Sequence, residues 1–231
     1  MNSNTFTTVI CFAAAVIIPY LLSGINSAII VTKIKTGKDI RTMGSGNAGL
    51  TNTLRTQGKI AALFVLIGDI LKGMLSILAV HLIFLWLMGV NTYSLTEGWS
   101  WVNYFAGVFA VIGHIFPVYY GFKGGKGILV TFAAMLAINW VPGVLLFLLF
   151  AVIVALTRYV SLGSIIAAAC YPFAVLGFSL LQNDTCAWVN FGLSAVIGTM
   201  LIFMHRANIK RLLTHTEKKL GQKSGENEAA K

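Results

Sequence analysis

Charged residues are scarce in this chain. Of its 231 residues only 10% are Asp, Glu, Lys or Arg, whereas 57% are hydrophobic. Soluble domains carry about 25% charged residues, so this deficit argues for a protein embedded in a membrane. Residues 1–8 contain no Lys or Arg and thus lack the basic region of a cleavable signal peptide. We therefore expect the first apolar segment to remain in the mature protein.

Motifs of metal sites and covalent nucleophiles are also missing. The three cysteines, Cys11, Cys170 and Cys186, are far apart and form no Cys-x-x-Cys pair, so they support neither a disulfide framework nor a metal site. The chain has no His-Glu-x-x-His sequence and no Gly-x-Ser-x-Gly elbow. Only seven acidic side chains are present, and they are scattered. We expect no metal and no cofactor.

Basic residues outnumber acidic ones and give a net charge of +10. On a soluble protein this charge would suggest a nucleic-acid partner. Here the basic residues flank apolar segments, so we expect no nucleic acid and interpret the charge as a signal of membrane orientation. The apolar segments predict seven transmembrane helices, near residues 6–31, 60–88, 101–120, 128–140, 141–157, 161–181 and 187–204.

The fourth of these segments leaves an alternative open. Residues 128–140 would cover about 20 Å as a helix, against a hydrocarbon core of about 30 Å. Residues 128–157 could instead form one helix kinked at Pro142. Charge favours seven helices: with the N-terminus outside, every basic residue lies on the inner side except Lys72, which falls within the second segment. Six helices would leave the basic C-terminal residues outside.

The sequence thus predicts an all-α integral membrane protein with seven transmembrane helices, an outer N-terminus and a cytoplasmic C-terminus. Residues 1–217 are expected to form a single membrane domain, and residues 218–231 a polar, disordered cytoplasmic tail.

A first glycine-rich polar loop runs Gly44-Ser-Gly-Asn-Ala-Gly-Leu-Thr-Asn-Thr-Leu-Arg55. It fits the G-x-G-x-x-G pattern, but a basic segment precedes it and a membrane span follows, so the strand and βαβ unit of a dinucleotide fold are absent. Glycines nevertheless expose backbone amides, and an arginine can bind phosphate or carboxylate with two hydrogen bonds. The alternative is a polar loop that only sets topology. Candidate anion-binding residues are Ser45, Asn47, Thr51, Asn52 and Arg55.

A second such loop, Phe122-Lys-Gly-Gly-Lys-Gly127, directly precedes the predicted fourth helix. Amides at a helix N-terminus favour an anion, although the alternative is a tight turn with flanking cations. The sequence is not a Walker A motif. Candidate residues are Lys123, Gly124, Gly125, Lys126 and Gly127.

Further polar residues are expected near the same inner face. Asp69 and Lys72 are three residues apart, hence on one helical face, and charges within a membrane span are candidates for function. The alternative for Asp69 and Lys72 is a structural ion pair. For His114 and His205 the alternative is a structural role. The remaining candidates are His114, Arg158, Ser161, His205 and Asn208.

Together these motifs resemble the bacterial acyl-phosphate:glycerol-3-phosphate acyltransferase family, PlsY. The resemblance rests on residues 44–55, Asp69-Ile-Leu-Lys-Gly73, Gly113-His-Ile-Phe-Pro117 with residues 122–127, Arg158-Tyr-Val-Ser-Leu-Gly163 and His205-Arg-Ala-Asn-Ile-Lys-Arg-Leu212. It implies a seven-helix enzyme of the bacterial inner membrane whose active site faces the cytoplasm. It also implies acyl transfer from acyl phosphate, not acyl-CoA, to the sn-1 hydroxyl of glycerol 3-phosphate, giving lysophosphatidate and phosphate in the first step of phospholipid synthesis. A functional link to an acyl-phosphate-forming enzyme follows.

The resemblance also implies roles for individual residues. Catalytic roles fall to Ser45, Arg55, Lys126, His205 and Asn208, and the other candidates together with Glu217 would bind substrate. Three positions depart from the family pattern: His215 stands where glycine is usual, Leu50 where alanine is usual, and Ala48 where proline is common.

Two other classes of protein, and the identity of the general base, remain open on the sequence. A small-anion transporter would need polar groups along its path, and the predicted outer half has almost none. A phosphatidyl-type phosphotransferase would need an acidic metal-binding cluster. Direct attack on acyl phosphate requires no covalent intermediate, and His114, His205, Asp69 or a substrate phosphate could accept the proton.

Overall fold

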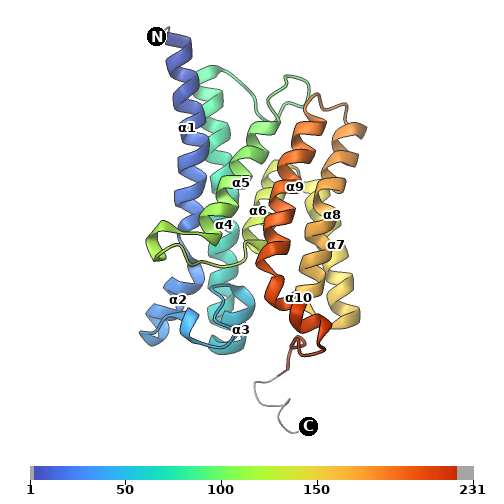
Figure 1. Ribbon diagram of the computed structural model, residues 1–231. Coiled ribbons are helices and arrows are strands. Elements are labelled where there is room, and N and C mark those ends of the chain that lie inside the picture. The colour runs from blue at the N-terminus through green and yellow to red at the C-terminus, as the bar shows by residue number, and fades with distance from the viewer. Residues whose placement is uncertain (1–2, 223–231) are drawn as a thin grey trace.

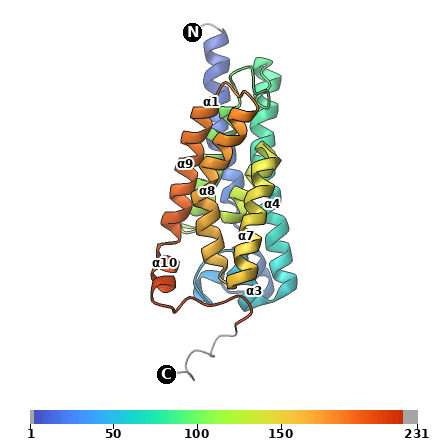
Figure 2. The same cartoon turned by 90° about the vertical axis from the view of Figure 1, so that its right-hand side faces the viewer.

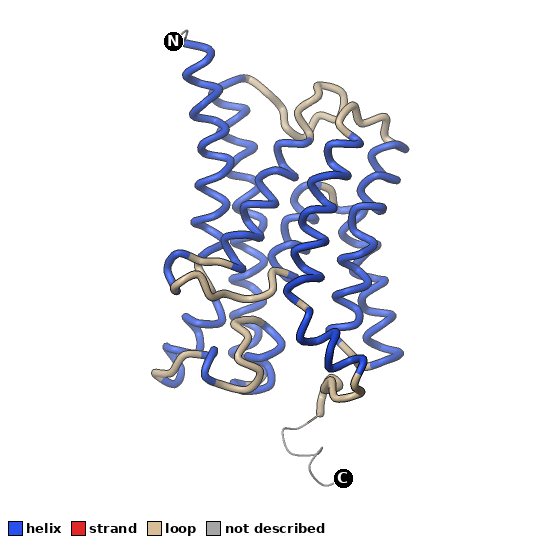
Figure 3. The backbone as a smooth tube through the Cα atoms, viewed as in Figure 1, coloured by secondary structure: helices blue, strands red, loops and turns tan. Residues whose placement is uncertain are grey.

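A computed structural model describes residues 3–222, and within that range the regular elements are all helices (Figures 1 and 3). The α-helices are α1 (Ser3–Gly24), α2 (Ser27–Thr36), α3 (Leu50–Gln57), α4 (Lys59–Met88), α5 (Trp101–Ile115), α6 (Ile128–Ile138), α7 (Trp140–Thr157), α8 (Val160–Leu181), α9 (Ala187–Met204) and α10 (Arg206–Leu213). Two short 3₁₀ helices are η1 (Ile40–Thr42) and η2 (Val118–Tyr120). The all-α prediction is confirmed for these residues.

Six helical segments of the described chain are long and apolar enough to cross a membrane, one fewer than predicted. The difference is α6, which has 11 residues and spans about 16 Å. Asn139 separates it from α7 by accepting a hydrogen bond from Val141 N at 3.2 Å, so residues 128–157 do not form one kinked helix. The turn between them lies well short of the end that α4 reaches (Figure 2). α6 therefore penetrates the bundle without traversing it.

The long helices expose large apolar side chains and keep their charged residues inside the bundle. On α4, Leu63, Phe64 and Ile67 are exposed, whereas Asp69 and Lys72 are buried. This arrangement suits a lipid environment, where polar groups must find partners inside the protein.

Glycine allows two pairs of helices to pack backbone to backbone. A Cβ on Gly113 of α5 would lie 2.2 Å from the carbonyl oxygen of Tyr20 on α1, and one on Gly198 of α9 would lie 2.6 Å from that of Ala168 on α8. Small residues at helix contacts are typical of membrane bundles.

The polar segments gather at one end of the bundle. The N-terminal end of α1 lies at the upper end in Figure 1, whereas α2, α3 and α10 lie at the lower end. The loop of residues 116–127 crosses the bundle above them. Residues 218–222, placed in the predicted tail, are described and adjoin the lower end, whereas residues 223–231 lie outside the described range.

Candidate active site

A cavity of about 1810 Å³ lies among the lower halves of the helices, with polar walls below and apolar walls above. Its polar walls come from α3, α10 and the loops, and its apolar walls from α4, α6, α7 and α8. The structure brings most of the predicted site residues to this one cavity. These are Ser45, Asn47, Thr51, Asn52, Arg55, Asp69, His114, Lys126, Gly127, Ser161, His205, Asn208 and Glu217.

Asn52 organises the first loop from within. Its side-chain oxygen accepts the Ser45 N–H at 2.9 Å, and its amide nitrogen donates to the carbonyls of Met43 and Asn47, both at 3.0 Å. Its side chain is thus fully engaged in holding residues 43–47 over the start of α3. Although Asn52 lines the cavity, its contacts shape the loop.

Ser45 and Arg55 both carry free polar groups in this loop. Within the described chain neither the Ser45 hydroxyl nor the Arg55 guanidinium has a hydrogen-bond or ion-pair partner, and both residues line the cavity. Helix α3 begins at the same place after Gly49, with no side chain capping its first amides. An unpaired guanidinium beside uncapped helix amides forms a site for an oxyanion.

Arg41, which the sequence analysis gave no site role, connects the first loop to the second. Its Nη1 donates to the carbonyls of Tyr120 and Lys123, both at 2.8 Å, while Nη2 pairs with Asp39 at 2.7 Å. The hydrogen bonds from Arg41 hold the pKa of Asp39 below its usual value. The Asp-x-Arg spacing was the only sequence signal for this link.

The second loop packs tightly against the end of α5. A Cβ on Gly124 would lie 2.0 Å from the His114 carbonyl oxygen, and one on Gly125 would lie 2.3 Å from His114 Nε2. The amides of Gly124 and Gly125 donate to the carbonyls of Ile115 and His114. Their glycines permit this close approach, and their N–H groups are used inside the protein. Gly127, with φ of 85°, then begins α6 at the cavity wall.

His114 is oriented by a buried lysine. Lys72 Nζ contacts Asp69 Oδ1 at 2.8 Å, the Ile25 carbonyl at 2.8 Å and His114 Nδ1 at 3.0 Å. An ammonium only donates, so Nδ1 of His114 must accept and the proton of the neutral ring sits on Nε2. His114 therefore reaches the cavity as a hydrogen-bond donor, and Lys72 fixes that tautomer.

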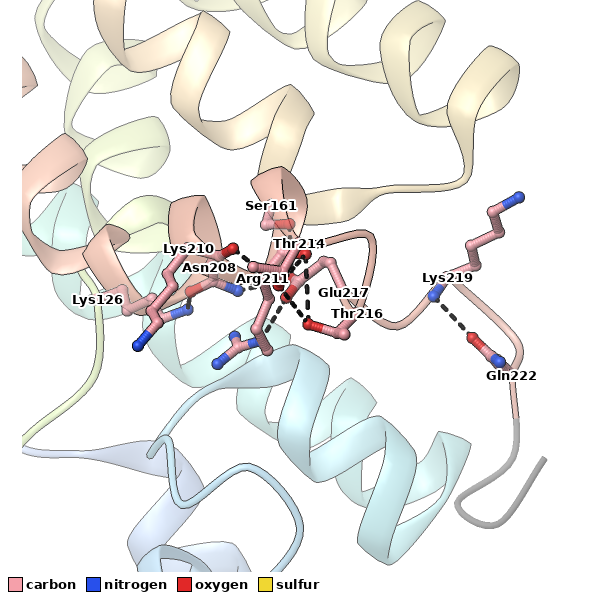
Figure 4. Close-up of polar contacts among 10 residues, drawn as sticks. All are labelled: Lys126, Ser161, Asn208, Lys210, Arg211, Thr214, Thr216, Glu217, Lys219 and Gln222. Carbon is pink, nitrogen blue, oxygen red and sulfur yellow. Dashed lines mark hydrogen bonds and ion pairs between the residues drawn. The ribbon is translucent and has the colours of Figure 1, made fainter. Parts of the chain in front are cut away.

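Glu217 is the hub of a second polar cluster, drawn in Figure 4. Its Oε1 accepts from Ser161 Oγ and Asn208 Nδ2, both at 2.7 Å, and its Oε2 accepts from Arg211 Nε at 2.6 Å. Asn208 Oδ1 in turn accepts from Lys126 Nζ. Burial alone would raise the pKa of Glu217, but these hydrogen bonds lower it below its usual value. The cluster thus holds an ionised carboxylate beside two cations.

Lys126 and His205 both have perturbed pKa values. Burial lowers the pKa of Lys126 to about 8. The negative charge of Glu217 opposes this shift, whereas the positive charges of Arg211 and Arg55 add to it. Burial, followed by the charge of Lys126, lowers the pKa of His205 to about 4. His205 Nδ1 donates to the Leu201 carbonyl at 2.7 Å, so the neutral ring keeps a lone pair on Nε2. His205 and His114 therefore present opposite tautomers to one cavity.

Several predicted residues stand behind the cavity wall. Lys72, Gly124 and Gly125 do not line the cavity. Lys123 is exposed and also lies outside the lining, and Arg158 is bound to the C-terminal segment. Arg158 Nη2 donates to the Leu220 carbonyl at 2.8 Å, and Leu220 N donates to the Arg158 carbonyl at 2.7 Å. These bonds hold residues 218–222 across the cavity mouth, which they help to line.

His215, the position where the family usually has glycine, has φ of 55°. This left-handed conformation is one that glycine adopts without strain. The substitution therefore falls at a turn where a side chain is tolerated but not favoured, just before Glu217.

Among residues 3–222, no group of three or more His, Cys, Asp or Glu side chains could hold a metal ion. The fold and the cavity define a class: a multi-pass membrane protein in which a cationic pocket opens into an apolar chamber. Such a site suits a substrate with an anionic head and a hydrocarbon tail.

The chain belongs to the glycerol-3-phosphate acyltransferase family, whose pattern it matches over residues 13–215. It is 41% identical over 207 residues to the glycerol-3-phosphate acyltransferase of Clostridioides difficile (strain 630), covering 90% of this chain and 94% of that protein. The corresponding protein of Nostoc sp. (strain PCC 7120) is 40% identical, with 91% and 92% covered. A crystal structure of PlsY (YgiH), an integral membrane glycerol 3-phosphate acyltransferase in its glycerol 3-phosphate form, superposes with a TM-score of 0.73. It is 35% identical, with 90% of this chain and 94% of that chain covered.

Proposed function

We propose that this protein transfers a fatty acyl group from acyl phosphate to the sn-1 hydroxyl of glycerol 3-phosphate, releasing lysophosphatidate and inorganic phosphate. The observation that carries the proposal is one cavity that combines unpaired cations with an apolar chamber, in a chain of the glycerol-3-phosphate acyltransferase family. The acceptor follows from the family, and the acyl phosphate donor from the motif pattern of the sequence.

The acyl phosphate head is assigned to the first loop. Arg55, the Ser45 hydroxyl and the uncapped amides of α3 offer several donors to one phosphate, and no bond within the described chain competes for the two side chains. Such donors would also stabilise the negative charge that develops as the carbonyl is attacked.

Glycerol 3-phosphate is assigned to the wall formed by the end of α5, the second loop and α10. Lys126 offers a cation, His114 an N–H donor, and Asn208 a polar group held by Glu217. Arg211 lies on the same wall and keeps two guanidinium nitrogens beyond its bond to Glu217. Positioning two anions side by side is the main requirement of the reaction, because acyl phosphate already carries a good leaving group.

In the reaction, the sn-1 hydroxyl oxygen bonds to the acyl carbon, and the bond from that carbon to the phosphate oxygen breaks. The hydroxyl proton needs an acceptor. Asp69 is neutralised by Lys72, and His114 presents its N–H, which leaves His205 Nε2 or an oxygen of the substrate phosphate. Retained turnover in His205→Gln would assign the proton to the phosphate, and loss of turnover with substrate binding intact would assign it to His205.

The acyl chain is assigned to the apolar chamber, reached from the bilayer. The lining of this chamber includes Leu66 and Ile70 of α4, Phe147 and Phe150 of α7, and residues of the short helix α6, whose Phe132 stacks on Phe147. Each buried methylene contributes about 0.8 kcal/mol, so a fatty acyl group strongly favours this route over delivery through water. We place the polar end of the bundle on the cytoplasmic side, because the basic segments lie at that end and basic loops favour the cytoplasm. A separate enzyme must then supply acyl phosphate to the inner leaflet.

The upper half of the bundle argues against a small-anion transporter. The polar groups that line the large cavity belong to its lower half, and the polar cluster near Asp184 at the other end borders a void of about 20 Å³. Residues 3–222 also lack the metal-binding group that a phosphatidyl-type phosphotransferase requires.

The test is phosphate release by purified protein in lipid, supplied with palmitoyl phosphate in the presence and absence of glycerol 3-phosphate. We expect release that depends on the acceptor, with lysophosphatidate as the second product. Replacing palmitoyl phosphate with palmitoyl-CoA should abolish transfer. Acceptor-independent hydrolysis alone, or no release by a folded sample, would overturn the proposal.

A further inference from the structure

The apolar chamber has a defined direction. Its lining follows one face of α8 from Ser161, beside the polar cluster, through Ser164, Ala167 and Ala168 to Tyr171. These positions recur every three or four residues, as a single face of a helix requires. Between Ser161 and Tyr171 the helix rises about 15 Å. The chamber therefore runs upward from the reacting groups into the bundle.

Packed side chains close the upper end of this chamber. Tyr171 is 2% exposed and belongs to one buried cluster with Tyr104, Leu146 and Ala168. Behind it, α8 and α9 touch through backbone, because a Cβ on Gly198 would lie 2.6 Å from the Ala168 carbonyl oxygen. A wall in such close contact has little room to move aside.

We propose that Tyr171 limits the length of the acyl chain that this protein transfers, and that the small side chain of Ala167 keeps the path to it open. The inference rests on the proposed acyltransferase function and adds a specificity-determining residue to it. Methylenes that lie below Tyr171 should change kcat/KM little, because the acyl chain comes from bilayer hydrocarbon that is about as apolar as the chamber. A longer acyl chain would have to bend or displace the ring, so kcat/KM should fall beyond one length.

The experiment measures kcat/KM for a series of saturated acyl phosphates of increasing length, each at the same mole fraction in lipid nanodiscs. For the unmodified protein we expect kcat/KM to stay nearly constant up to one chain length and to fall beyond it, and that length is the break in the profile. Tyr171→Ala should move the break to longer chains, because it removes the ring at the end of the chamber. Ala167→Leu should move it to shorter chains, because it narrows the path one turn lower.

Two control variants separate length selection from general damage. Tyr171→Phe removes the hydroxyl and keeps the ring, so its break should coincide with that of the unmodified protein. Ala169→Leu adds the same bulk to α8 on an exposed position outside the cavity lining, and it should also leave the break in place. If Tyr171→Ala does not fold, Tyr171→Leu and Ala167→Leu still test the proposal from opposite directions.

A break at the same length in every folded variant would overturn the proposal, as would a profile without any break. Either result would mean that the acyl chain leaves the cavity between α4 and α7 and lies in the bilayer. Failure of the unmodified protein to transfer any member of the series would instead contradict the proposed function itself.

Discussion

Two carboxylates at opposite ends of the molecule are surrounded by donors in similar numbers but of different kinds. Glu217 accepts from Ser161, Asn208 and the cation Arg211. Asp184, between α8 and α9, accepts only from neutral groups: Ser100 Oγ at 2.8 Å, Asn190 Nδ2 at 2.8 Å, Ser179 Oγ at 3.3 Å and the backbone N–H of Cys186 at 2.9 Å. Both clusters join segments that are distant in sequence.

The surroundings of the two clusters separate their roles. The Asp184 cluster borders a void of about 20 Å³, room for a single water molecule, whereas the Glu217 cluster borders the cavity of about 1810 Å³. Four donors satisfy the Asp184 carboxylate, which makes the cluster a clamp between α5, α8 and α9, while the buried Asn190 Oδ1 has no hydrogen-bond partner within the described chain. Cations at the Glu217 cluster exceed the negative charge present, so the site has capacity for an anion. Excess donors facing space, not polarity itself, mark the candidate site.

The largest effect is expected for Arg55→Ala. Removing the unpaired guanidinium should lower kcat/KM by about 10²–10³-fold, the usual cost of losing a donor to developing negative charge. Acyl transfer in nanodiscs measures it. Arg206→Ala is the matched control, because Arg206 lies at the same end but outside the cavity lining and should change activity little. Equal losses in both variants would mean that Arg55 contributes only general positive charge.

Asp184→Asn should damage stability and spare catalysis. The variant turns an acceptor into a donor among four donors, and unsatisfied buried groups cost about 1–3 kcal/mol. We expect a lower midpoint of chemical unfolding, with activity per folded molecule unchanged. Glu97→Gln is the control, since Glu97 is an exposed carboxylate in the α4–α5 connection at the same end. A loss of activity without a loss of stability would contradict the proposed contrast between the Asp184 and Glu217 clusters.

The fold was predictable to the extent that apolar runs define helices. The predicted span 60–88 corresponds closely to α4, Lys59–Met88. The run 6–31 gave no sign that α1 and α2 are separate, because the break depends on Asn26, whose side chain caps α2 through Ile29 N at 3.0 Å and also binds the Ala48 carbonyl. Hydropathy alone also could not show that α6 stops inside the bundle.

The sequence predicted which residue types form the site, but not which of their side chains remain free to bind a ligand. Glycine, lysine and arginine in two polar loops pointed to anions, and the loops do meet at one cavity. Sequence could not show that the Asn52 side chain is used within its own loop, or that Arg41 reaches Tyr120 across the fold. Such roles depend on which donors are left over after folding, and only the contacts reveal that.

The pH dependence of the reaction should report on the Glu217 cluster. Lys126 has a pKa of about 8, so kcat/KM should fall as pH rises through that value and the ammonium is lost. Glu217 favours the charged lysine, so Glu217→Gln should move this alkaline limb to lower pH. A fall of about one pKa unit would lower kcat/KM at pH 8 by about fivefold, because the charged fraction of Lys126 drops from about one half to about one tenth. Glu217→Asp keeps the charge and should move the limb less. An alkaline limb in the same place for all three proteins would exclude Lys126 as its source.

Arg158→Ala should have the smallest effect. Arg158 was predicted to bind substrate, yet its side chain holds the Leu220 carbonyl and lies outside the cavity lining. An exposed hydrogen bond contributes about 1 kcal/mol or less, so we expect KM to rise by less than about fivefold with kcat unchanged. The backbone should not respond, because alanine has the same difficulty as arginine with φ of 61°. Deleting residues 220–231 provides the comparison: it should reproduce the effect of Arg158→Ala, and combining the two changes should add nothing. A fall in kcat of about 100-fold in Arg158→Ala alone would instead place the guanidinium on the substrate, as the sequence suggested.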